Sequence, residues 1–77
     1  MKQCYVIFAS FDNESHAIGA VEITDDLSSD EVRAKCTAVV QEDSESMRDV
    51  SLEALLGKGV FEIGMGINYT AKLLTLF

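Results

Sequence analysis

A helix start near the middle of the chain is the feature that most constrains the fold. Ser28 is followed three residues later by Glu31. This is the spacing of a capping box, in which the hydroxyl accepts a backbone N–H and the carboxylate returns to the cap. Leu27 and Val32 flank it at the positions of a hydrophobic staple. We therefore predict a helix that begins at Ser28 and needs another surface on which to bury its apolar face.

The body of this helix has one apolar face. Its apolar side chains recur at helical spacing, namely Val32, Cys36, Val39 and Val40. Charged and polar residues lie outside this stripe, so the pattern predicts a helix that packs on a sheet by one face. The pattern fades over residues 41–46, where we expect the helix to end.

Two extended segments precede the helix. In residues 2–11 both alternating sets of side chains are apolar, which predicts a strand covered on both faces. Residues 17–24 also have extended character, and one alternating set includes Ala17, Val21 and Ile23. The polar residues 12–16 between them predict a β-hairpin with a loop of about five residues.

The C-terminal part of the chain predicts a short helix and further β-structure. Ser51 is placed to cap a helical turn that ends at Gly57. Apolar side chains then alternate with polar or glycine residues over 61–69, which is a strand period. One long strand and a hairpin that turns at Gly64–Gly66 both fit this pattern.

The size of the chain allows one compact domain, residues 1–77. Its elements predict an α+β fold, with a small antiparallel sheet of three to four strands and one main helix packed on one face. The order is ββα followed by β or ββ, with a short second helix as an option. Burial in so small a core barely balances the entropy lost on folding. This balance is one reason to expect a partner or a second copy.

The cysteines and the lack of long apolar runs bear on location. Cys4 and Cys36 form no CxxC motif and have no companion cysteine or histidine cluster. We expect them to be buried free thiols in a reducing cytoplasm. No apolar run reaches the length of a membrane helix, so we expect no membrane partner.

Side chains that could carry chemistry are sparse. Asp12, Glu14 and His16 have a spacing similar to the start of a calcium loop, but Ala17 and Ile23 occupy the positions that require glycine and glutamate. His16 is the only histidine and has no nucleophile motif around it. We therefore predict no catalytic residue, no metal site, no cofactor and no enzyme activity.

The net charge of −7 lies entirely in residues 12–31, because the rest of the chain holds equal numbers of acids and bases. Such a segment can meet a basic groove built for nucleic acid, whereas direct nucleic-acid binding is opposed by sign. A solvated acidic face is the alternative. The predicted binding residues are the seven acids of this segment, Asp12, Glu14, Glu22, Asp25, Asp26, Asp30 and Glu31.

A short, acidic, compact α+β chain of this kind resembles phage and mobile-element proteins that inactivate host defences, including anti-CRISPR and anti-restriction proteins. The resemblance covers size, charge and fold class. It implies a protein-binding inhibitor whose partner is the basic surface of a protein or nucleoprotein complex. The alternative is a homodimeric structural or interaction module, in which strand edges pair with a second copy and the acids maintain solubility.

Overall fold

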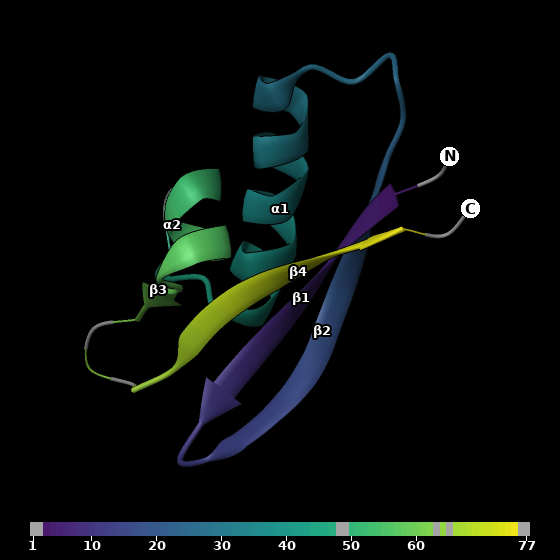
Figure 1. Ribbon diagram of the computed structural model, residues 1–77. Helices are drawn as coiled ribbons and strands as arrows, with labels where there is room; N and C mark the ends of the chain where they lie inside the picture. Colours follow the sequence, from purple (N-terminus) through teal and green to yellow (C-terminus); the bar gives the residue numbers. More distant parts are fainter. Residues whose placement is uncertain (1–2, 48–49, 63, 65, 76–77) are drawn as a thin grey trace.

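A four-stranded antiparallel sheet with two helices on one face forms the domain (Figure 1). The computed structural model describes residues 3–47, 50–62, 64 and 66–75. Along the chain the elements are β1 Gln3–Phe11, β2 Glu14–Ile23, α1 Ser29–Asp43, α2 Leu52–Gly57, β3 Val60–Phe61 and β4 Asn68–Thr75. The strands lie in the order β2-β1-β4-β3. The predicted α+β fold is therefore confirmed, with a ββααββ order.

The hairpin that joins β1 and β2 is tighter than expected. Its loop is Asp12 and Asn13 alone, and both have positive φ angles, of 50° and 71°. Two-residue loops with positive φ at both positions match the twist of the flanking strands, and Asp and Asn tolerate this conformation. The predicted loop of about five residues is wrong, because residues 14–16 pair in the sheet instead.

The β2 strand contains one extra residue. Ile7 pairs with Gly19 while Phe8 pairs with Ala17, so Ile18 is a bulge with no partner on β1. Because a bulge shifts the alternation of a strand by one residue, side chains on its two sides change faces. Val21 is buried under the helices as expected, but Ala17 is exposed on the other face. The prediction that Ala17 and Val21 lie on the same face of the strand is therefore wrong.

The α1 helix begins as predicted. Ser28 is the N-cap, and its hydroxyl oxygen accepts from the backbone N–H of Glu31 at 3.2 Å. The Glu31 carboxylate accepts from the Ser28 hydroxyl at 3.3 Å rather than from the backbone of the cap. The helix ends at Asp43, with Ser44 as C-cap, inside the segment where the apolar pattern fades.

Replacing Ser28 by Ala should lower the free energy of unfolding by about 1 kcal/mol, because the N–H of Glu31 loses its acceptor. Urea denaturation of the purified chain measures this loss. Ser29→Ala is the matched control, since Ser29 is exposed at the first helical position. Equal midpoints for the wild type and Ser28→Ala would contradict the role of the cap.

The core lies between the helices and the inner face of the sheet. Its most deeply buried side chains, all under 2% exposed, come from every layer: Tyr69, Ile7, Leu55, Val40, Val50 and Cys36. Cys4 and Cys36 are buried free thiols, as predicted. Burial raises the pKa of the Cys36 thiol above its ordinary value.

The outer face of the sheet has no helix over it among the described residues (Figure 1). The β1 side chains Val6 and Phe8 point to this face and are partly buried by their neighbours. The prediction that this strand is covered on both faces is therefore wrong for the single chain. The two faces of β1 thus meet different surroundings: one packs in the core, and the other, on which Cys4 is buried and Val6 and Phe8 are partly buried, has no described helix over it.

The C-terminal elements confirm the short helix and show a hairpin, one of the two alternatives for the residues after it. Ser51 caps α2, with its hydroxyl accepting from the N–H of Ala54 at 3.5 Å. The chain turns between β3 and β4, and Gly64 and Gly66 have positive φ angles there. Two residues of the alternating run, Ile63 and Met65, lie outside the described residues. No described helix is long and apolar enough to cross a membrane.

Candidate functional site

The seven predicted binding residues do not lie together on one side of the molecule. Asp25, Asp26, Asp30 and Glu31, which we call the helix-start acids, lie in the β2–α1 connection and the first turn of α1. Asp12 and Glu14 lie at the opposite end of β2, in and beside the hairpin loop. Ten extended residues span about 33 Å, in a molecule 38 Å long (Figure 1). Glu22 lies on β2, one residue before the strand ends.

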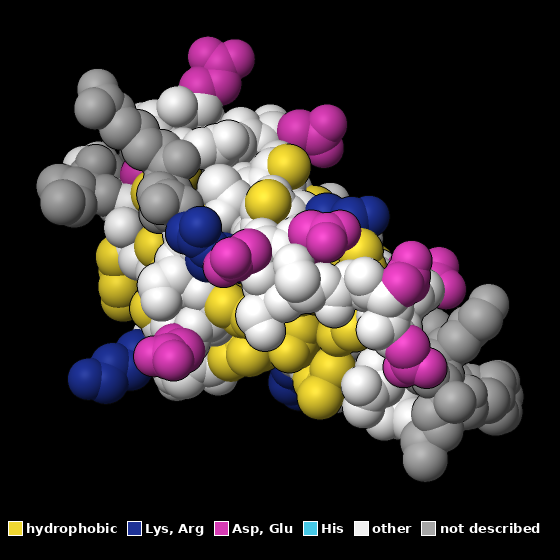
Figure 2. Space-filling model, turned by 90° about the horizontal axis from the view of Figure 1, so that it is seen from above, with side chains coloured by type: hydrophobic (Ala, Val, Ile, Leu, Met, Phe, Trp, Pro, Cys, Tyr) yellow, Lys and Arg dark blue, Asp and Glu magenta, His cyan; other side chains and the backbone are white. Residues whose placement is uncertain are grey.

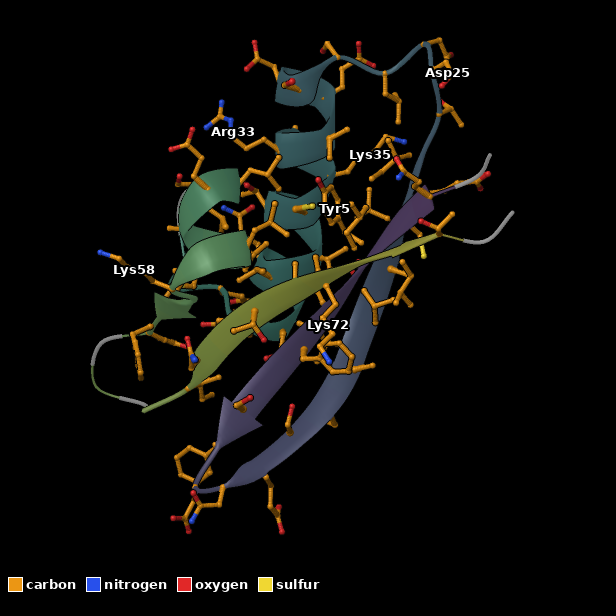
Figure 3. The ribbon with its side chains drawn as sticks, in the orientation of Figure 1. Tyr5, Asp25, Arg33, Lys35, Lys58 and Lys72 are labelled. Atoms are coloured by element: carbon orange, nitrogen blue, oxygen red, sulfur yellow. The ribbon has the colours of Figure 1, made fainter. Side chains whose placement is uncertain are left out.

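The helix-start acids form a dispersed charged surface. Figure 2 shows acidic side chains spread over the end of the molecule seen from above, with Lys and Arg side chains among them. Asp25 lies at the outer bend of the connection (Figure 3). The Thr24 hydroxyl donates to Asp26. This bond, with a backbone N–H and the charge of Lys35, holds the pKa of Asp26 below its ordinary value, so the carboxylate stays charged.

A hollow at the hairpin end brings together residues from three parts of the sequence. It has a volume of about 310 Å³ and lies beyond the C-terminal end of α1. We call it the hairpin pocket, defined by Ala9, Phe11, Glu14, His16, Asp43 and Ile67. One of the predicted binding acids, Glu14, and the histidine His16 thus meet Asp43 of α1, which lies outside the predicted acidic segment 12–31.

The bulge at Ile18 decides what the pocket contains. Beyond it, His16 pairs with Ala9 and Glu14 pairs with Phe11. Directly paired residues of an antiparallel sheet point to the same face, and Ala9 is buried on the helix side. The bulge therefore turns Glu14 and His16 to the side on which α1 lies. Strict alternation from Val21 would have placed them on the outer face.

The Asp43 carboxylate is held by the core. The Tyr69 hydroxyl donates to Oδ2 of Asp43 at 2.7 Å, and the Tyr69 side chain is fully buried. Burial and the bond to Asp43 together raise the pKa of Tyr69 to about 12. A buried strand residue thus fixes an acid at the last position of α1. No local pattern signals this pair, because 26 positions separate the two residues.

A second polar group lies next to Tyr69. The Ser46 hydroxyl donates to Glu62, and the hydroxyls of Ser44 and Ser46 lie 3.0 Å apart. Hydrogen bonds from Ser44 and Ser46 lower the pKa of Glu62 below its ordinary value. The Glu62 side chain is 9% exposed, and its Oε2 has no hydrogen-bond partner among the described residues. A charged carboxylate therefore lies close to the Tyr69 side chain.

The hairpin pocket is suited to bind a cation through its carboxylates. Two carboxylates and an imidazole line it, together with apolar side chains. Across the part of the chain that the structure describes, no group of three or more His, Cys, Asp and Glu side chains is placed to hold a metal ion. Comparison with protein-family models, curated proteins and solved structures finds no match to this chain.

Proposed function

We propose that this chain is a small acidic protein-binding inhibitor that occupies a basic, nucleic-acid-binding surface on a larger complex. The class that we propose is that of phage and mobile-element inhibitors of anti-CRISPR or anti-restriction type. The observation that carries the proposal is the group of helix-start acids, which projects four carboxylates from one end of a small folded domain. Because all four belong to the connection or the first helical turn, the backbone presents them together.

Charge supports a protein partner rather than nucleic acid. The chain carries 13 acids against six bases, so phosphate groups are repelled. A groove lined by Lys and Arg attracts an anionic surface, and such charges act mainly on the rate of association. An acidic domain seated in the groove would exclude the nucleic acid that normally lies there.

Neutralising the helix-start acids should slow association with a basic partner. In the triple variant Asp25→Asn, Asp26→Asn and Asp30→Ser, we expect an on-rate at least about tenfold lower at low salt, because rim charges act through steering. The measurement is capture from a bacterial lysate by the immobilised wild type, followed by kinetics on the retained complex. Binding of the wild type should also weaken as salt contracts the Debye length to about 8 Å.

The control for this experiment keeps the same change in net charge. The variant with Glu42→Gln, Glu45→Gln and Glu53→Gln also removes three exposed carboxylates, but none is a helix-start acid. Denaturation of both variants checks the fold, since Asp30 also favours the helix dipole. Equal on-rates for the two triple variants would mean that the helix-start acids contribute to solubility and not specifically to binding.

A homodimeric module is the second candidate, and the open face and edge of the sheet favour it. β2 is an edge strand of ten residues, and β4 is covered by β3 only at Tyr69 and Asn68. Leu74 is 44% exposed and pairs with Cys4, on the outer face that also carries Val6 and Phe8. Light scattering separates the two candidates, because a stable dimer has twice the 8.4 kDa mass of the chain.

A further inference from the structure

The charge of the hairpin pocket is one-sided. Glu14 and Asp43 line it beside the imidazole of His16, and among the described residues no Lys or Arg does. A second hollow, of about 300 Å³ between β2 and α1, holds Lys35 together with Glu22, so its charges are balanced. The hairpin pocket is thus the hollow whose described lining calls for a cationic occupant.

The walls of the pocket suit a cation carried on an apolar stem. Ala9 and Ile67 supply aliphatic surface, along which the methylene groups of a long basic side chain pack. Phe11 is 58% exposed, and a Cβ on Gly66 would lie 3.6 Å from its ring. An exposed ring beside carboxylates favours a planar guanidinium, which stacks on the aromatic face while its N–H groups reach oxygen acceptors.

Part of the pocket is already oriented for binding. The bond from the buried Tyr69 hydroxyl engages Oδ2 of Asp43, so the position of this carboxylate is set by the core. An acceptor that is held in place loses little freedom when a donor binds, which increases affinity. Glu14 faces the same space from β2 because of the bulge at Ile18.

The volume of the pocket is sufficient for one long side chain. At about 310 Å³ the pocket is at the lower end of the range of about 300–1,000 Å³ for ligand sites. We propose that the hairpin pocket is a receptor for one arginine side chain of a protein partner. This inference rests on the proposed function, which identifies the partner as a basic protein. It adds one contact that this partner makes.

The test is a titration followed by the ¹⁵N–¹H spectrum of the intact chain. The probe is the tripeptide acetyl-Gly-Arg-Gly-amide, and the matched probe contains citrulline, which has nearly the same shape without the charge. We expect the arginine peptide to shift the amide signals of residues that line the pocket, above all Phe11, His16 and Ile67. The citrulline peptide should cause at most a small fraction of these shifts at equal ionic strength.

Variants locate the binding site. Glu14→Gln should weaken binding of the arginine peptide roughly tenfold, because it removes one charged acceptor and keeps the shape. Asp12→Asn is the matched control. It changes the net charge equally from a neighbouring position outside the pocket, and asparagine suits the positive φ of Asp12. We expect Asp12→Asn to weaken binding by less than about twofold.

Three results would overturn the proposal: equal shifts with arginine and citrulline, shifts that map away from the pocket, or equal effects of Glu14→Gln and Asp12→Asn. The peptide titration needs no natural partner, so its failure is distinct from failure of the proposed inhibitor. A chain that binds the arginine peptide but captures no basic complex would retain the pocket and lose the inhibitor. The reverse result would retain the inhibitor and move its contact elsewhere.

Discussion

Leu55→Ala should lower the free energy of unfolding by about 2–5 kcal/mol, because the side chain is 1% exposed at the centre of the core. This is a large part of the roughly 4–12 kcal/mol expected for a chain of this length. The six-residue helix α2 is too short to form alone and depends on this contact with the sheet. Urea or thermal denaturation measures the loss.

The neighbouring leucine is a matched control. Leu56 is 41% exposed, so Leu56→Ala makes the same chemical change and leaves the buried core in place. We expect its effect to stay below about 1 kcal/mol. Similar losses for the two variants would contradict the orientation of α2 on β4.

Tyr69→Ala should have an effect of the same size, about 3–5 kcal/mol, because it empties the volume of a fully buried aromatic side chain. Tyr69→Phe keeps the ring and removes only the hydroxyl that donates to Asp43. Its cost should be about 1 kcal/mol, because the exposed Asp43 carboxylate can bond to water instead. Denaturation of both variants near neutral pH separates packing from hydrogen bonding.

Comparing the wild type with Tyr69→Phe also measures how the contribution of Tyr69 to stability depends on pH. The pKa of Tyr69 is about 12 in the folded chain, above its ordinary value of 10.0. The unfolded chain therefore releases this proton first, so the stability that Tyr69 contributes is complete below pH 10 and is lost as pH rises toward 12. The stability difference between wild type and Tyr69→Phe should shrink over this interval. A constant difference would mean that the phenol is not protected in the core.

Local signals in the sequence were sufficient for the elements and the fold class. The cap at Ser28 and the spacing of Val32, Cys36 and Val40 predict α1 correctly, because a capping box and a helical stripe involve residues within one or two turns. Ser51 predicts the start of α2 in the same way. The hairpin position was also predicted, but the length of its loop was not, because polar residues 14–16 pair in the sheet.

The sequence predicted only part of the candidate site. Counting charges identified Glu14 and the helix-start acids, and it grouped them by their closeness along the chain. An extended strand separates its two ends by its full length, so β2 carries these acids to opposite ends of the molecule. Asp43 lies outside the acidic segment 12–31 and was not among the predicted binding residues, yet it lines the same pocket as Glu14.

The sequence by itself determined the local features: where helices start, which runs are extended, and how much acidic charge the chain carries. Only the tertiary structure decided which of Leu55 and Leu56 is buried, which face β2 presents beyond Ile18, and which acid the core holds through Tyr69. The first group depends on interactions between residues close in the chain, which periodicity records. The second depends on the register of strand pairing and on packing between distant segments, where a shift of one residue exchanges the two faces of a strand.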